Sequence, residues 1–227
     1  MSDPTSGSDE THAAPAPTAK RGFGLATRRL VLATRNAGKI AELSRILAGV
    51  GSKGGGDVQI VGLESFPDAP DVPETGLTFA DNALLKARAI AAYTGLPAVS
   101  DDSGLAADAL HGMPGVLSAR WAGKHGDDAA NLALLLGQLA DVDQRGAAFV
   151  CVAALALPGG GEWTATGVLA GTLTRAPRGG NGFGYDPIFV PEGLSTTTAE
   201  LAPADKDAIS HRGRAFRAIA PLIAAHA

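Results

Sequence analysis

The stretch at residues 30–50, LVLATRNAGKIAELSRILAGV, changes its pattern part-way along. LVLAT at 30–34 is an apolar run typical of a short buried strand, and Asn36 then stands where a helix N-cap is expected. The apolar residues that follow recur at helical spacing, at Ile40, Leu43, Leu47 and Val50. A glycine-rich GSKGGGD ends this unit, and VQIVGLESF at 58–66 predicts a second strand. The order strand, turn, helix, strand predicts an α/β domain.

The rest of the chain continues to alternate strands with helices. Thr78 opens a helical stretch with Asp81 in a capping-box position, and PAVS at 97–100 predicts a short strand that stops at two aspartates. A single C-terminal helix is expected from about residue 207. Between them we first expect a loop interrupted by Gly and Pro, GMPGVLSARWAG, and then a helix, DDAANLALLLGQLADV. A long β-hairpin, AAFVCVAALAL–PGGG–EWTATGVLAGTLT, is expected next, followed by a glycine-rich loop, APRGGNGFGYDP, that ends in IFV.

Composition narrows the class of protein. The 227 residues are 45% hydrophobic and 19% charged, which suits a globular domain, predicted here at residues 29–227. Residues 1–28 are rich in Pro, Ala, Ser, Thr and Gly and predict a disordered extension. The lone Cys151 lies in an apolar run, which favours a core residue and a reduced, cytoplasmic setting. The net charge of −4 argues against a broad nucleic-acid surface, and no apolar run is long enough to predict a membrane span.

The turn ATRNAGK at 33–39 is the first candidate site. A turn between a strand and a helix exposes backbone N–H groups at the helix N-terminus, where a phosphate can bind. A Walker A loop would need Gly at 33 and Ser or Thr at 40, and Ala33 and Ile40 exclude it. Lys39 falls in the first helical turn, where a cation opposes the helix dipole. It is therefore either an anion-binding residue or a lysine that faces solvent.

The stretch VSDDSGL at 99–105 is the second candidate site. If the strand ends here, the turn can bring the carboxylates of Asp101 and Asp102 together. Two adjacent carboxylates disfavour joint ionisation, and a divalent cation such as Mg²⁺ removes that conflict. The alternative is an Asx-type turn in which Asp102 or Ser103 caps a backbone N–H.

Two further stretches carry aromatic and basic residues. In GGNGFGYDP at 179–187, Phe183 and Tyr185 could stack on a purine and Asp186 could accept from a base edge. The alternative there is a surface turn with one aromatic side chain anchored in the core. The stretch KDAISHRGRAFR places positive charge at a helix start, suited to an anion or to a solvated basic face, through Lys206, His211, Arg212 and Arg214.

Six stretches together resemble the inosine/xanthosine triphosphate pyrophosphatase family, also called XTP/dITP diphosphatases. They follow in order over nearly all of residues 30–217, as LATRNAGKIAEL, PETGLTFADNALLKARA, VSDDSGLAADAL, GMPGVLSARWAG, GFGYDPIF and TAEL…KDAISHRGRA. The resemblance implies an α/β fold with an elongated mixed β-sheet, flanking helices and two lobes around a substrate cleft, usually as a homodimer. It also implies Mg²⁺-dependent hydrolysis of ITP, dITP or XTP to the monophosphate and pyrophosphate, which keeps deaminated bases out of DNA and RNA.

The resemblance assigns roles to individual residues. It implies Asp102 as the catalytic acid–base residue, and metal binding by Asp102, Asp101 and Glu74. It implies substrate binding by Thr34, Arg35, Asn36, Ala37, Gly38, Lys39, Ser103, Phe183, Gly184, Tyr185, Asp186, Lys206, His211 and Arg212. At one position the chain departs from the family pattern, since Asp81 stands where Glu is frequent, and a metal role for Asp81 is not expected.

These roles suggest a mechanism and leave alternatives open. Asp102 would act as general base for in-line attack at the α-phosphorus, with pyrophosphate leaving near Lys39. A pocket that donates to the 6-oxo group and accepts from N1–H would reject adenine. Three alternative functions remain. The chain could be a phosphatase or kinase on a related scaffold, or a non-catalytic nucleotide-binding module. A nucleic-acid-binding protein is the alternative with the least support.

Overall fold

The described residues form one mixed six-stranded sheet with helices on both faces. The structure is a computed structural model that describes residues 28–48 and 58–227. The strand order is β2-β1-β3-β4-β5-β6, with β1 parallel to β2 and β3 and all later neighbours antiparallel. The mixed sheet predicted from the sequence is confirmed. The strands are β1 (Arg28–Leu32), β2 (Val58–Gly62), β3 (Ala98–Ala107), β4 (Gly146–Ala156), β5 (Glu162–Leu173) and β6 (Phe189–Pro191).

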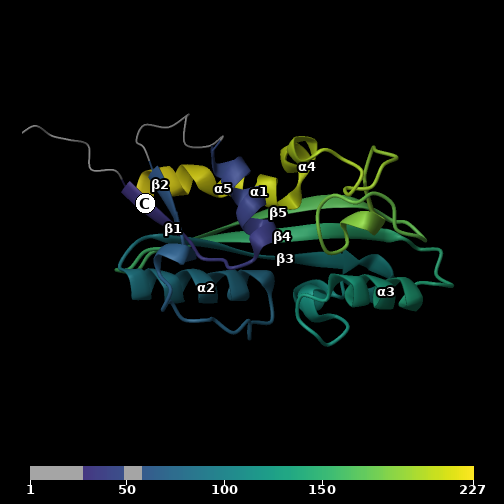
Figure 1. Ribbon diagram of the computed structural model, residues 1–227, viewed down its shortest axis with the longest axis horizontal. Helices are drawn as coiled ribbons and strands as arrows, with labels where there is room; N and C mark the ends of the chain where they lie inside the picture. Colours follow the sequence, from purple (N-terminus) through teal and green to yellow (C-terminus); the bar gives the residue numbers. More distant parts are fainter. Residues whose placement is uncertain (1–27, 49–57) are drawn as a thin grey trace, which may run out of the picture.

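The helices divide between the two faces of this sheet. In Figure 1, α2 and α3 cover one face, and α1, α4 and α5 lie on the other. Their bounds are α1 (Ala37–Ala48), α2 (Phe79–Thr94), α3 (Asp128–Gln138), α4 (Pro203–Ile209) and α5 (His211–His226). Short 3₁₀ helices are η1 (Leu63–Ser65), η2 (Asp108–Leu110), η3 (Gly115–Arg120) and η4 (Asp186–Ile188). Within the described ranges, every helix is too short or too polar to cross a lipid bilayer.

The core is divided between the two ends of the long strands β3, β4 and β5. At the end that carries β1, helices α1 and α5 pack on one face, through residues such as Leu43 and Phe216, while α2 packs on the other. At the far end, Leu135 of α3 joins Leu105 and Phe189 in a third buried cluster. This division gives the elongated, two-lobed shape that the resemblance implied (Figure 1).

Several local predictions are confirmed at the ends of the first two helices. Asn36 caps α1, because its Oδ1 accepts the Lys39 N–H at 3.0 Å. Thr78 and Asp81 form the predicted capping box at the start of α2. In α1, Leu43 is fully buried, while Val50 and the GSKGGGD stretch lie outside the described residues. The predicted extension also lies outside them, apart from Arg28, which is the first residue of β1.

The prediction that a strand stops at the paired aspartates is wrong. β3 continues through them to Ala107, and it pairs with β4 from Ala98↔Ala156 to Ala107↔Ala147. Gly104 serves close packing here, because a Cβ at this position would lie 2.4 Å from both the Gly115 carbonyl oxygen and Ser118 Oγ of η3. The Ser-Gly pair that resembles a turn is therefore the place where η3 packs against the strand.

The prediction of one continuous C-terminal helix is also wrong. Ser210 has extended backbone dihedral angles, with φ −60° and ψ 150°, and separates α4 from α5. Its Oγ accepts the Gly213 N–H at 2.9 Å, which caps the start of α5. Serine bonds to a nearby backbone N–H more readily than it continues a helix, and this preference explains the break.

Candidate active site

A cleft of about 710 Å³ opens where β1 ends beside the longer β3. Two parallel strands leave a crevice at their carboxyl ends, and ligands commonly bind there in α/β folds. The walls come from both lobes, and every predicted site residue lines the cleft except Asp101. Predicted residues that are far apart in sequence, from Thr34 to Arg212, therefore meet in one place.

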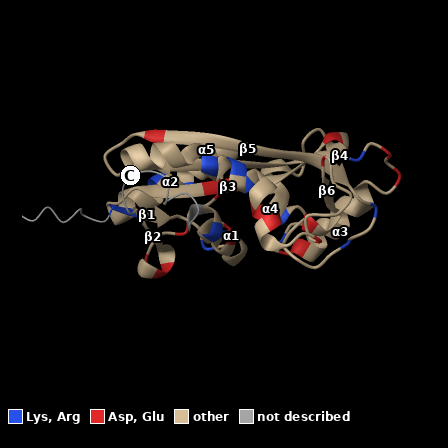
Figure 2. Cartoon of the chain, turned by 90° about the horizontal axis from the view of Figure 1, so that it is seen from above, with Lys and Arg blue, Asp and Glu red and all other residues tan. Residues whose placement is uncertain are grey.

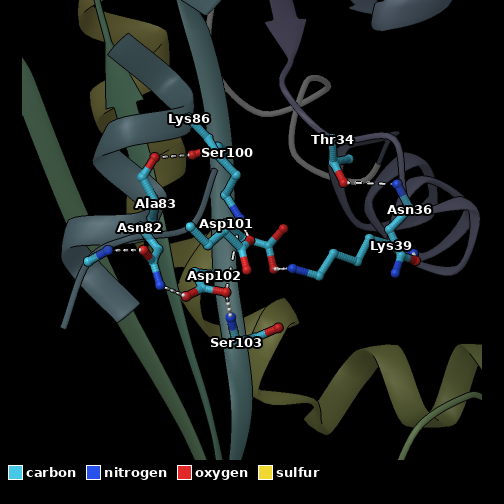
Figure 3. A network of polar contacts seen from close by, with 12 residues as sticks. Thr34, Asn36, Lys39, Asn82, Ala83, Lys86, Ser100, Asp101, Asp102 and Ser103 are labelled. Carbon is cyan, nitrogen blue, oxygen red and sulfur yellow. Dashed lines mark hydrogen bonds and ion pairs between the residues drawn. The ribbon is translucent and has the colours of Figure 1, made fainter. Parts of the chain in front are cut away.

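Asp102 faces the cleft from the side of β3 that packs against α2 (Figure 3). Its Oδ2 accepts from Asn82 Nδ2 at 3.0 Å and its Oδ1 accepts the Ser103 N–H at 2.9 Å. Burial raises the pKa of Asp102, and the nearby charge of Glu74 adds to this rise against the opposing charge of Lys86. A carboxylate with a raised pKa at the wall of a cleft is suited to accept a proton.

Asp101 points to the opposite face of β3. Its Oδ2 lies 3.0 Å from Lys39 Nζ and 3.2 Å from Arg212 Nε, and its side chain is fully buried. Burial alone would raise the pKa of Asp101, but the charges of Lys39 and Arg212 outweigh it and hold the pKa far below its usual range. Because the strand alternates its side chains, the two aspartates do not share a turn. Asp101 as a metal ligand stays a prediction, and its charge is already paired with two cations.

Arg212 lies on α5 and links it to α1 and to β3. Its Nη1 donates to Glu42 of α1 and its Nη2 donates to Ser103 Oγ at 2.7 Å. Figure 2 shows the acidic stretch of β3 lying between basic stretches of α1 and α5. The Arg212 side chain is 2% exposed, and the charges of Asp101 and Glu42 raise its pKa despite burial. This network fixes the floor beneath the Lys39 turn.

Lys86 lines the cleft, and no role was predicted for it from the sequence. Its Nζ lies 2.6 Å from Glu74 Oε1 and 3.9 Å from Asp102 Oδ1. Burial would raise the pKa of Glu74, but the charge of Lys86 holds it lower than usual. The signal was present in the sequence, because Asn82 and Lys86 stand four residues apart on α2 and share one helix face.

The glycine-rich loop before β6 forms the opposite end of the cleft. Phe183 packs over the first turn of α1, where a Cβ on Gly38 would lie 3.0 Å from Phe183 Cδ1. Lys206 Nζ lies 5.2 Å from the centre of the Phe183 ring and bonds to Asp186 Oδ2 at 2.6 Å. Tyr185 is anchored in the third core cluster, and its hydroxyl donates to the Ser118 carbonyl at 3.0 Å. Of the two aromatics, Phe183 is the one less buried.

His211 lines the same end of the cleft as a buried imidazole. Its ring stacks on Phe149 with centroids 4.8 Å apart. Burial, followed by the charges of Arg212 and Lys206, holds the pKa of His211 well below its usual value, so the imidazole is neutral at pH 7. Its Nδ1 has no hydrogen-bond partner among the described residues. A neutral imidazole with a free nitrogen can accept from or donate to a ligand.

Two polar residues have structural roles instead. Asp81 caps α2, as its capping-box position predicted, and it does not line the cleft. Cys151 is fully buried, and burial raises its pKa, which fits the predicted core role. Within residues 28–48 and 58–227, no three His, Cys, Asp or Glu side chains cluster as a ready metal site.

Known proteins resemble this chain over the residues that form the fold and the cleft. A sequence profile of the Ham1 family matches residues 30–222. The chain belongs to the Ham1 family. A Streptomyces coelicolor relative named dITP/XTP pyrophosphatase is 60% identical over 197 residues, covering 86% of this chain and 96% of the relative. A relative of the same name from Mycobacterium tuberculosis is 54% identical over 197 residues, 86% of this chain and 95% of that protein.

Solved structures of Ham1 proteins share the fold as well as the sequence. A crystal structure of a nucleoside-triphosphatase / dITP/XTP pyrophosphatase from Mycobacterium abscessus is 55% identical with a TM-score of 0.69 and covers 85% of this chain and 99% of its own. A HAM1 protein from Coxiella burnetii is 41% identical with a TM-score of 0.77, covering 87% and 98%. The family resemblance and the fold class inferred from the sequence are confirmed.

Proposed function

We propose that this chain hydrolyses deaminated purine nucleoside triphosphates (dITP, ITP and XTP) to the monophosphate and pyrophosphate. The observation that carries the proposal is Asp102, a buried carboxylate of raised pKa at the centre of a cleft lined with cations. The Streptomyces and Mycobacterium relatives, both named dITP/XTP pyrophosphatase, support the same activity. By removing these nucleotides, the enzyme would keep deaminated bases out of DNA and RNA.

The donor set of the cleft fits Mg²⁺. Mg²⁺ prefers oxygen ligands and commonly binds one or two carboxylates together with substrate phosphates. Asp102 and Glu74 supply such carboxylates, and the charge of Glu74 contributes to the raised pKa of Asp102, a conflict that a cation relieves. When bound, the cation would supply charge neutralisation for the triphosphate and make a water molecule more acidic.

Different residues of the cleft would have different roles in the reaction. Asp102 would accept the proton of the attacking water, and the Asn82 amide holds its carboxylate in place at 3.0 Å. Lys39 and Lys86 would offset the negative charge that moves onto the leaving pyrophosphate. The turn before α1 presents backbone N–H groups at a helix N-terminus, which suits a phosphate. Positioning and charge would supply most of the catalysis.

Selectivity for 6-oxo purines would come from the other end of the cleft. Phe183 offers a ring face for stacking, and donors surround it on Lys206, His211 and Arg212. The carboxylate of Asp186 is already bonded to Lys206, the Phe183 N–H and Thr198 Oγ1. A donor-rich pocket favours an oxo group over the 6-amino group of adenine. Unpaired buried groups can make such discrimination as large as about 10⁴-fold.

Turnover of a panel of nucleotides tests this proposal. We expect the purified protein to release pyrophosphate from dITP, ITP and XTP in the presence of Mg²⁺, and to turn over dATP and dGTP far more slowly. EDTA should abolish the release, and excess Mg²⁺ should restore it. Equal turnover of dATP and dITP, or binding of dITP without hydrolysis, would contradict the proposal; the second result would favour a nucleotide-binding module.

The homodimer is proposed on the family resemblance alone, whereas the setting and partners are proposed from the lone Cys151 and the net charge of −4. We expect a homodimer, with the domain at residues 29–227, in a reducing, cytoplasmic setting with no nucleic-acid or membrane partner. Light scattering of the purified full-length protein tests the dimer. A monomeric mass at micromolar concentration would contradict it.

A further inference from the structure

Arg120 lines the cleft together with Ser118 and Ala119 of the GMPGVLSARWAG stretch, and it is the charged residue of the three. It ends η3, and η3 is fixed to β3 next to Asp102. Ser118 Oγ accepts the Leu105 N–H at 2.9 Å and donates to the Gly115 carbonyl at 2.7 Å. Arg120 therefore extends from a rigid support, which is the condition for a side chain that must meet a ligand in one geometry.

Contacts among the side chains give their order along the cleft. Arg212 lies 5.7 Å from the Phe183 ring and bonds to Ser103, the neighbour of Asp102. From Asp102 the contacts continue to Lys86, then to Glu74, and then to Arg120. A purine on Phe183 with its α-phosphorus at Asp102 would therefore extend its β- and γ-phosphates toward Arg120. This step rests on the proposed function.

The cations at this end differ in how firmly they are paired. Lys39 is 3.0 Å from Asp101 and Lys86 is 2.6 Å from Glu74, so each ammonium group is in direct contact with a carboxylate. Arg120 Nη1 is 3.7 Å from Glu74 Oε2, too far for a hydrogen bond, and its side chain is 30% exposed. Its Nη2 donates to the Glu74 carbonyl at 3.3 Å. Among the described residues, Nη1 and Nε of Arg120 make no hydrogen bond, so donors remain for a ligand.

We propose that Arg120 binds the β- and γ-phosphates of the substrate and thus the pyrophosphate product. A guanidinium offers two parallel donors that match phosphate oxygens. The bond of Nη2 to the Glu74 carbonyl holds the side chain in the lining of the cleft, and Nη1 and Nε are the donors left for a ligand. Arg35 also lines this region, and it already belongs to the predicted nucleotide-binding turn.

Binding of inorganic pyrophosphate, measured by calorimetry in EDTA, tests the assignment without turnover. For Arg120→Gln we expect the affinity for pyrophosphate to fall at least about tenfold, while the affinity for dIMP stays within twofold. Arg120→Lys, which retains the charge and loses the paired donors, should fall between. Arg178→Gln is the matched control, because Arg178 also bonds to a backbone carbonyl and pairs with a glutamate at 3.8 Å but lies outside the cleft lining.

The same measurement in a Glu74→Gln background separates direct binding from an effect through the Glu74 carboxylate, which is the only Glu74 group that this substitution changes. If Arg120 contacts pyrophosphate, adding Arg120→Gln should weaken binding again. No further loss would overturn the proposal, because Arg120 would then act only through the Glu74 carboxylate. Unchanged pyrophosphate affinity in the single variant, or equal loss of dIMP binding, would also overturn it. Turnover of dITP by the wild type is measured separately and tests only the proposed function.

Discussion

The two faces of β3 give adjacent aspartates opposite environments. On one face, Asp101 is fully buried between Lys39 and Arg212, and these charges hold its pKa far below the usual range. On the other face, Asp102 borders the cleft, and burial raises its pKa. Strand alternation alone separates them. One aspartate anchors the cations that form the floor of the site, while the other is available to exchange a proton.

The largest expected effect is on turnover when Asp102 is made neutral. Asp102→Asn removes the proposed base and should lower kcat by about 10²–10⁴-fold. The amide has nearly the same shape, so the fold should be retained. Steady-state kinetics with dITP measure the loss, and circular dichroism checks the fold. Asp143→Asn, at a surface pair with Arg175, is the control that should keep full activity. Near-normal turnover of Asp102→Asn would remove Asp102 from the mechanism.

A comparable change on the other face should act mainly on stability. Asp101→Asn leaves Lys39 without its carboxylate partner and Arg212 with Glu42 alone, and breaking a buried ion pair in this way costs about 3–5 kcal/mol. Urea unfolding monitored by tryptophan fluorescence gives the free energy of unfolding. A loss below about 1 kcal/mol would mean that Glu42, the other partner of Arg212, compensates and that the two faces differ less than their charges suggest.

Some elements of the fold could be predicted from the sequence, and others could not. Caps and hairpins depend on neighbouring residues, so the Thr78–Asp81 capping box and the hairpin of β4 and β5 were predictable. The length of β3 was not, because Ser-Gly is typical of a turn, and only pairing with β4 and packing of η3 keep this segment extended. The break at Ser210 was missed because it depends on the Ser210 side chain capping the Gly213 N–H, which residue spacing does not reveal.

The site was predicted to the extent that its motifs are local. The resemblance selected the residues of the Thr34–Lys39 turn and the loop at Phe183, and the structure brings them to one cleft. Lys86 and Arg120 were not identified, because long side chains reach the cleft from elements that are distant in the sequence. The opposite directions of Asp101 and Asp102 followed only once the strand was known to continue.

A smaller effect tests why the strand continues past the aspartates. Gly104→Ala would place a Cβ 2.4 Å from the Gly115 carbonyl oxygen and Ser118 Oγ, so η3 must move. Overpacking of this kind costs about 1–3 kcal/mol. Gly137→Ala, in α3 with no atom within 4 Å of the added Cβ, is the matched control and should stabilise the protein by up to about 1 kcal/mol. Thermal unfolding compares the two, and equal midpoints would contradict close packing at Gly104.

The smallest expected effect concerns how the free energy of unfolding depends on pH, which should differ between the aspartates on the two faces of β3. The raised pKa of Asp102 means that its ionisation destabilises the fold, so this cost appears as pH rises above 3.8, the ordinary value for aspartate. In EDTA, the stability of Asp102→Asn relative to the wild type should therefore increase between pH 4 and pH 7. For Asp101 the pKa is lowered, so its contribution is present above 3.8 and is lost in acid. Urea titrations at several pH values measure both, and parallel curves for wild type and Asp102→Asn would refute the difference.

Phosphorus NMR of the products formed from dITP tests the central claim most directly. Wild-type protein and Asp102→Asn are compared at equal concentration with Mg²⁺. The account predicts equal amounts of dIMP and pyrophosphate from the wild type and almost none from the variant. Orthophosphate as the product, or the same pyrophosphate signal from both proteins, would contradict it.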